Sequence, residues 1–149
     1  MIQPKFVISE KPDTDIREAI LRPLLNYNAS KVGRTATGSL AIALRHPDTD
    51  ETIGGLWATS AYNWLFIELL FVPDEFSRRG IGSSLMRQAE QMAISRGHIG
   101  IRLDTMNFQA PDFYEKLGYQ KFGRLENYPI GYEHIYYFKM LPGNPAQRN

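Results

Sequence analysis

A glutamate and a glycine-rich turn are the residues whose types and spacing could carry chemistry. Glu68 interrupts the apolar run WLFIELLFV, residues 64–72. Burying a carboxylate in an apolar strand costs free energy unless the group has a partner or a function. Shortly afterwards the sequence SRRGIG, residues 77–82, leads into an amphipathic segment that predicts a helix. The carboxylate and the turn therefore both need an explanation.

The turn combines the features of an anion-binding site. The first amides of a helix have no partner within the helix, and the helix dipole adds partial positive charge there. Gly80 and Gly82 would let the backbone approach a ligand, and Arg78 and Arg79 add positive charge. A diphosphate would suit this loop, although an ordinary loop with solvated arginines is the alternative. A Walker A motif is excluded by the lack of a Gly-Lys pair, and a Rossmann fingerprint by Leu85 at the third glycine position.

The composition is that of an ordinary globular protein. The 149 residues are 43% hydrophobic and 22% charged, which predicts a single domain over residues 1–149 with residues 142–149 as a loose tail. The net charge of +1 gives no basic field for nucleic acid, and no apolar run approaches the roughly 18 residues of a membrane span. Because Cys is absent, disulfides and a thiol nucleophile are excluded. We expect a cytoplasmic protein without nucleic-acid or membrane partners.

Hydrophobic periodicity predicts a mixed α/β sheet, with the strands and helices in the order β α β β β α β α β β. Short turns join the three consecutive strands, which favours antiparallel pairing between them. The strand–helix–strand unit that follows favours a parallel pair of strands. Pro23 is expected to kink or split the first helix, and residues 28–38 are expected to form a loop. The predicted strands are residues 5–9, 39–46, 52–60, 64–72, 98–105, 119–125 and 133–141, and the predicted helices are residues 12–28, 81–96 and 110–119.

With these elements in place, the sequence resembles the GNAT superfamily of acetyl-CoA-dependent N-acetyltransferases. LFVPDEFSRRGIG, residues 70–82, is similar to the family's fourth strand, pyrophosphate loop and following helix. LDT and NFQAPDFYEKLGY, residues 103–105 and 107–119, are similar to a second family motif. The order and separation of the two blocks agree with the family, so the resemblance implies a GNAT-like fold over nearly the whole chain. The sequence departs from the pattern at Ser77, where the family has Gln or Arg.

The resemblance implies an enzyme that transfers an acetyl group from acetyl-CoA, its cosubstrate, to a primary amine. The transfer would be a direct attack in a ternary complex, on a small-molecule acceptor and without a metal. One alternative is a protein N-terminal or lysine acetyltransferase, and another is a non-catalytic acyl-CoA-binding module. The identity of the acceptor stays open, as does the oligomeric state, although homodimers are common in the family.

The resemblance also implies roles for individual residues. A primary amine is almost fully protonated at pH 7, so a base is useful, and Glu68 is the candidate. Its alternative role is structural, bonded to a neighbour or facing solvent at a sheet opening. Tyr114 matches the family's tyrosine near the coenzyme sulfur, where it would donate a hydrogen bond or a proton to the leaving thiolate, unless it only packs under the sheet. The coenzyme-binding candidates are Leu70, Phe71, Val72, Ser77, Arg78, Arg79, Gly80, Ile81, Gly82, Ser83 and Asn107, with Gln109 as an alternative to Asn107.

Histidines and late tyrosines complete the set of candidate residues. His46, His98 and His134 have no metal-like spacing, so each is interpreted as a surface or hydrogen-bonded side chain. His134 lies on a late strand that could border the acceptor site. The tyrosines near the C-terminus are interpreted as core and dimer contacts or, alternatively, as a wall of the acceptor pocket: Tyr128, Tyr132, Tyr136 and Tyr137.

Overall fold

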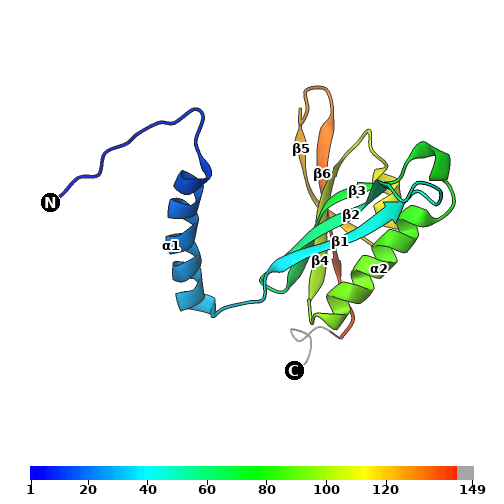
Figure 1. Cartoon of the computed structure of the whole chain (residues 1–149), viewed down its shortest axis with the longest axis horizontal. Coiled ribbons are helices and arrows are strands. Elements are labelled where there is room, and N and C mark those ends of the chain that lie inside the picture. Colours follow the sequence, from blue (N-terminus) through cyan, green and yellow to red (C-terminus); the bar gives the residue numbers. More distant parts are fainter. Residues whose placement is uncertain (144–149) are drawn as a thin grey trace. The chain divides into compact units, whose positions relative to one another are not determined.

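The computed structural model describes residues 1–143 and divides the chain into two compact units, Met1–Thr35 and Ala36–Asn149. The first unit contains α1, Thr14–Val32 (Figure 1). Its N-cap is Asp13, whose carboxylate accepts a hydrogen bond of 3.1 Å from the amide of Ile16. Of the predicted kink or split at Pro23, the split was wrong, because the helix runs unbroken past this residue. Its last turn also takes in residues 28–32, which had been predicted as loop.

The strand predicted at residues 5–9 does not form, which is a second correction to the first unit. A strand needs hydrogen-bonded neighbours, and the sheet of this protein pairs other segments with one another. The predicted tail, residues 142–149, lies mostly outside the described residues. No helix among residues 1–143 is both long enough and apolar enough to cross a membrane.

The second unit is built on a six-stranded sheet in the order β1-β2-β3-β4-β6-β5 (Figure 1). Strands β3 and β4 are parallel and all other neighbours are antiparallel. The expected mixed α/β class is therefore confirmed, with antiparallel N-terminal strands, a central strand–glycine turn–helix unit and a C-terminal strand pair. The strands are β1 Gly38–Arg45, β2 Thr52–Ala61, β3 Trp64–Phe71, β4 Gly100–Met106, β5 Gln120–Glu126 and β6 Glu133–Met140.

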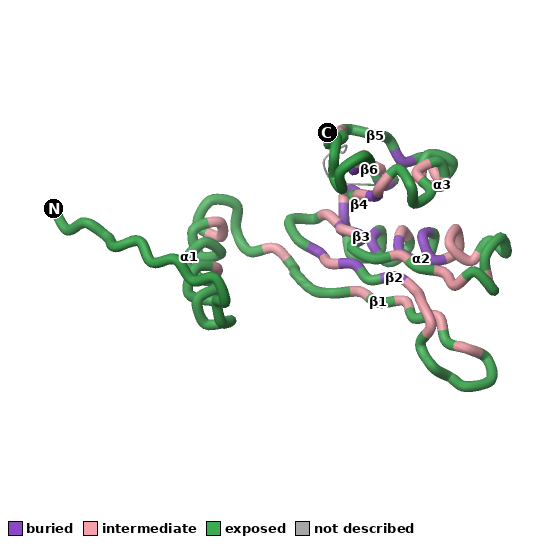
Figure 2. The backbone as a smooth tube through the Cα atoms, turned by 90° about the horizontal axis from the view of Figure 1, so that it is seen from above, coloured by how far each residue is buried: buried purple, intermediate pink, exposed green. Residues whose placement is uncertain are grey.

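Helix α2, Ile81–Ser95, connects the two parallel strands and covers the sheet. Its apolar residues recur at helical spacing, which gives one face to bury and leaves the polar residues in solvent. Figure 2 shows buried stretches along the strands and on α2. This contact forms the centre of the core. The buried residues of α2 are Leu85, Met86, Ala89 and Ala93, and they join Leu65, Ile67, Ile101 and Leu103 of β3 and β4.

A partly buried polar network holds the end of the short helix α3, Pro111–Lys116, against the same core. The hydroxyl of Tyr119 donates to Glu90 of α2 at 2.9 Å. The ammonium of Lys139 on β6 donates to Glu90 at 3.1 Å and to the carbonyl of Leu117 at 2.9 Å. Burial and the adjacent Glu90 carboxylate raise the pKa of Tyr119, so its hydroxyl stays a donor. The network ties α2, the end of α3 and β6 together.

The sheet splits between β3 and β4. Their parallel pairing ends at Ile67 and Leu103, while β3 stays paired with β2 and β4 stays paired with β6. On the β2 side Ile67 pairs with Ala58 and Leu69 pairs with Trp57, so Glu68 is the extra residue of a β-bulge. A bulge bends the strand that carries it. The sheet therefore opens from Glu68 onward into two halves, and we call this opening the fork.

Candidate active site

Glu68 lies at the start of the fork and is exposed to solvent. One oxygen of its carboxylate accepts a hydrogen bond of 3.2 Å from the hydroxyl of Thr59 on β2. The expectation of a carboxylate buried in an apolar strand was wrong at this position. Strand β3 separates from β4 just before Glu68, and this exposes the side chain. The alternative of a glutamate at a sheet opening describes its surroundings. A carboxylate in this place is accessible to a ligand that enters the fork.

The glycine turn follows the end of β3 through a short 3-10 helix, Asp74–Phe76. The amide and the hydroxyl of Ser77 both donate to the carbonyl of Asp74, at 3.0 and 2.7 Å. The hydroxyl proton of Ser77 is therefore used within the turn. Arg78, with φ of 62°, and Gly80, with φ of 75°, adopt left-handed backbone conformations that direct the chain into α2.

The first turn of α2 has no cap from a side chain of the described residues. Its first internal hydrogen bond joins the amide of Ser84 to the carbonyl of Gly80 at 3.0 Å, so the amides of Ile81, Gly82 and Ser83 precede it. Apart from the chain neighbours of Gly80, no atom of the described residues lies within 4 Å of the position that its Cβ would take. Arg78 and Arg79 are exposed beside these amides. Open space, unbonded donors and positive charge are what a phosphate group requires.

Tyr114 is held by aromatic packing on α3. Its ring centroid lies 5.0 Å from that of Phe113 and 6.0 Å from that of Tyr137. Phe113 in turn reaches the first turn of α2, since a Cβ on Gly82 would lie 3.3 Å from its ring. Helix α3 thus places Phe113 against the glycine turn and Tyr114 against Phe113. Burial, together with the negative charge of Asp104, raises the pKa of Tyr114 to about 12.

Asn107 and Gln109 both use their side-chain oxygens within the protein. The Asn107 oxygen accepts from the amide of Glu133 at 3.2 Å. The Gln109 oxygen accepts from the hydroxyl of Thr105 at 3.0 Å and from the amide of Met106 at 2.9 Å. These bonds fix the end of β4. Because the Gln109 oxygen already accepts two bonds, a ligand contact of Gln109 would come from its amide nitrogen, whereas Asn107 could also accept a bond with its oxygen.

Asp104 and His134 form a pair that the sequence analysis did not identify. Asp104 is the first residue of β4 beyond the last pair with β3, so it stands across the fork from Glu68. Its carboxylate bonds to Nε2 of His134 on β6. In the segment HIGIRLDT, Arg102 and Asp104 alternate with apolar residues. This alternation could have identified Asp104 as a polar residue on one face of a strand. Thr59, the partner of Glu68, carried no such signal.

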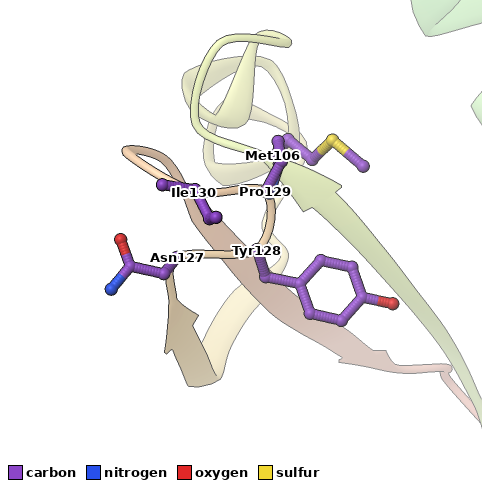
Figure 3. Close-up of a pocket in the computed structure, with 5 residues that line it drawn as sticks. All are labelled: Met106, Asn127, Tyr128, Pro129 and Ile130. Carbon is purple, nitrogen blue, oxygen red and sulfur yellow. The ribbon is translucent and has the colours of Figure 1, made fainter.

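An open pocket of about 640 Å³ lies beside this pair, at the turn between β5 and β6 (Figure 3). Met106 lines this pocket, and it is opposite His134 in the register of β4 and β6. Of the late tyrosines, Tyr128 lines this pocket and Tyr137 lies in the core. The lining residues are Met106, Asn127, Tyr128, Pro129 and Ile130.

The structure thus gathers the predicted residues into two groups around the fork. Glu68 lies at the opening of the sheet. The glycine turn lies beyond the end of β3, with Phe113 against it and Tyr114 against Phe113. Asn107 belongs to the other half of the sheet, where it bonds to the start of β6. His46 and His98 lie elsewhere: His46 bonds within the β1–β2 turn, and Nε2 of the buried His98 lies 2.9 Å from the hydroxyl of Ser60.

Comparison with solved structures defines the class of protein. The fold matches a crystal structure described as an acetyltransferase from Agrobacterium tumefaciens, with a TM-score of 0.86 and 35% identity over 93% of this chain and 100% of that one. Solved acetyltransferases of this fold include complexes with acetyl-CoA and with coenzyme A. The chain is therefore an acetyltransferase in architecture.

Sequence comparison gives the family. The acetyltransferase (GNAT) family model matches residues 8–119, and Acetyltransferase Atu2258 of Agrobacterium fabrum (strain C58 / ATCC 33970) is 39% identical over 80% of this chain and 87% of that protein. Blasticidin-S acetyltransferase of Streptomyces morookaense is 38% identical over 54% of this chain and 60% of its own length. The chain belongs to the GNAT family and is an acetyl-CoA-dependent N-acetyltransferase.

Proposed function

We propose that this enzyme acetylates a primary amine of a small molecule by direct attack on acetyl-CoA in a ternary complex. The observation that carries the proposal is the fork: an accessible carboxylate, Glu68, lies where the sheet opens, on a strand that leads to the uncapped start of α2. A relative named for a small molecule, blasticidin-S acetyltransferase, supports this class of acceptor. Residues 1–149 would act as one acetyltransferase domain, since the family match spans parts of both compact units.

The coenzyme's diphosphate would bind at the glycine turn. The amides of Ile81, Gly82 and Ser83 would donate to its oxygens, and Arg78 and Arg79 would add positive charge. The backbone of β3 along Leu70, Phe71 and Val72 would pair with the extended arm of the coenzyme as an added strand would. Among the described residues this stretch of β3 has no strand partner on its fork side. Ser77 would support the turn rather than bind the coenzyme.

Glu68 would act as the base. The proton of the acceptor ammonium must leave before the nitrogen can attack, at a cost of about 4–5 kcal/mol at pH 7 for an ordinary amine. Glu68 would take this proton, directly or through a water, and the nitrogen lone pair would form the new bond to the acetyl carbon. A backbone amide of β3 at Leu70 or Phe71 would stabilise the negative charge on the thioester oxygen in the tetrahedral intermediate.

Tyr114 would assist the departure of the thiolate by a hydrogen bond. A thiol has a pKa near 8.5, so a tyrosine with a pKa of about 12 is a much weaker acid. Full proton transfer would be uphill by about 5 kcal/mol, which favours donation of a hydrogen bond while the C–S bond breaks. Of the two expected roles of Tyr114, the raised pKa supports this one.

The proposal is tested by acetyl-CoA turnover against a panel of amines. Thiol release should accompany a mass increase of one acetyl group on a small amine acceptor, and peptides with free N-termini or lysines should react much more slowly. Preferred acetylation of the peptides would instead support the protein-acceptor alternative. Binding of coenzyme without turnover of any member of the panel would support the non-catalytic alternative.

A further inference from the structure

A second carboxylate faces the fork from the half of the sheet opposite Glu68. Pairing between β3 and β4 ends at Ile67 and Leu103, so Glu68 and Asp104 are the first residues beyond it on the two strands. Among residues 1–143, no Lys or Arg forms an ion pair with either carboxylate. Arg102, on the same strand as Asp104, stacks on the ring of Phe66 at 4.0 Å. The fork is therefore flanked by two carboxylates without a cationic lysine or arginine partner.

His134 fixes the orientation of Asp104. Its side chain is 7% exposed, and its Nε2 bonds to Asp104. Nδ1 of the same ring is buried and has no hydrogen-bond partner among the described residues. An N–H at Nε2 donates to the carboxylate, and the buried Nδ1 has no acceptor for a proton of its own among the described residues. His134 thus orients Asp104 through one hydrogen bond.

Aromatic rings border the same place. The ring centroid of His134 lies 4.2 Å from that of Tyr128 and 5.1 Å from that of Tyr136. Tyr136 lies directly opposite Asp104 in the register of β4 and β6. In agreement with this, burial and then Asp104 raise the pKa of Tyr136 and of Tyr114. Aromatic faces and a carboxylate together are the groups that attract an organic cation.

We infer that Asp104, oriented by His134 and bordered by the rings of Tyr128 and Tyr136, is the subsite that binds the acceptor as its ammonium ion. The pocket of Met106, Tyr128, Pro129 and Ile130 would take the body of the acceptor (Figure 3). The role as an acceptor subsite rests on the proposed function. Asp104 would bind the cation, and Glu68 across the fork would receive its proton. The selected class is a positively charged amine with a partly apolar body.

The direct test uses a cation that cannot be acetylated. The full chain is titrated with choline and, separately, with 3,3-dimethylbutan-1-ol, which has the same shape without the charge. Two-dimensional NMR follows the ring signals of His134, Tyr128 and Tyr136. Choline should shift these signals and bind about tenfold or more tightly than the neutral isostere. Equal binding of the two probes, or shifts confined to other residues, would overturn the inference.

Variants separate the effect of the Asp104 charge from the effect of its hydrogen bond to His134. Asp104→Asn should abolish the preference for choline, whereas Asp48→Asn, on the exposed β1–β2 turn, should keep it. His134→Phe removes the bond to Asp104 and should weaken choline binding, while His134→Gln keeps a donor and should retain part of the affinity. Melting temperatures identify any variant that fails to fold. An unchanged choline preference in folded Asp104→Asn would contradict the proposed subsite.

Kinetics test the Asp104 subsite separately from the proposed acetylation of amines. With any amine that the enzyme acetylates, Asp104→Asn should raise KM for the amine about tenfold or more and leave KM for acetyl-CoA within about twofold. Amine turnover with an unchanged amine KM would refute the subsite and leave the proposed function intact. Selective choline binding without turnover of any amine would refute the acceptor role together with the proposed function.

Discussion

Glu68 occupies the position at which β3 changes from an interior strand to one side of an opening. The bulge gives this residue no partner on β2, and the end of pairing with β4 exposes it to the fork. Its carboxylate accepts a hydrogen bond from Thr59, and the residue is exposed to solvent. The same residue in a continuous sheet would be a costly buried charge.

Glu68→Gln removes the proposed base and keeps the size of the side chain. General-base catalysis contributes about 10²- to 10⁴-fold, so kcat should fall by this range while KM for acetyl-CoA changes little. Steady-state thiol release measures both constants. The matched control is Glu51→Gln on the exposed β1–β2 turn, which should retain full activity. A kcat unaffected by Glu68→Gln would remove this residue from the mechanism.

Tyr114 should make the stability of the protein depend on pH in the alkaline range. Its pKa is raised from 10.0 to about 12, chiefly by burial and then by Asp104. A raised pKa means that the stabilisation is complete below pH 10 and is lost as pH rises through about 12. The loss amounts to about 2–3 kcal/mol, because each pKa unit corresponds to 1.36 kcal/mol.

Tyr114→Phe should therefore melt with a shallower decline than the wild type between about pH 10 and 12. At pH 7 the same change should lower kcat about tenfold, because a hydrogen bond to a developing charge is lost, and should spare coenzyme affinity. Thermal unfolding across pH and steady-state kinetics measure these effects. Tyr27→Phe, at an exposed position on α1, should melt as the wild type does. Parallel pH profiles for Tyr114→Phe and wild type would contradict the role of burial.

At the scale of the elements, the start of α2 depends on a left-handed residue. Gly80 has a φ of 75° and Gly97, just past the end of the same helix, has a φ of 76°. Among the described residues, no neighbouring atom lies within 4 Å of an added Cβ at either glycine. An alanine at either position would therefore be strained by its backbone angle and not by a clash. Gly80 lies at the proposed phosphate site, and Gly97 lies away from it.

Gly80→Ala and Gly97→Ala should each destabilise the protein by about 1–2 kcal/mol. Only Gly80→Ala should also weaken coenzyme A binding, because relaxation of its backbone turns the first amides of α2 away from the diphosphate. Denaturant unfolding and calorimetric titration measure the two effects. If Gly97→Ala weakens coenzyme binding equally, the turn has no special part in it.

At the scale of the whole molecule, binding of coenzyme should stabilise the folded state. A ligand at 100 times its Kd adds about 2.7 kcal/mol to the free energy of unfolding. For a chain of 149 residues this corresponds to a rise in Tm of about 5–10 °C. Thermal unfolding with coenzyme A and with the same concentration of adenosine separates the contribution of the diphosphate and the pantetheine arm. An unchanged Tm with coenzyme A would oppose the proposed site at α2.

Local patterns were sufficient for most elements of the second unit. Apolar spacing of 3.6 residues predicted α2, and Gly97 predicted its end. Pro111 in the first turn and the glycine that follows predicted α3. These features are local because hydrogen bonding and the allowed backbone angles of a residue depend on its near neighbours. The first unit was harder to predict, since the apolar residues 5–9 have strand propensity without a strand to pair with.

The sequence by itself determined the chain's strand–turn–helix unit and, through two local motifs, its resemblance to the acetyltransferase family. Only the tertiary structure decided where the sheet opens, since this depends on which residues of β3 pair with β2 and β4. It also decided that Asp104 and His134, 30 residues apart, form a pair. Local sequence fixes backbone angles and which residues are apolar. The partner of a side chain across a sheet depends on register, which is set by long-range packing.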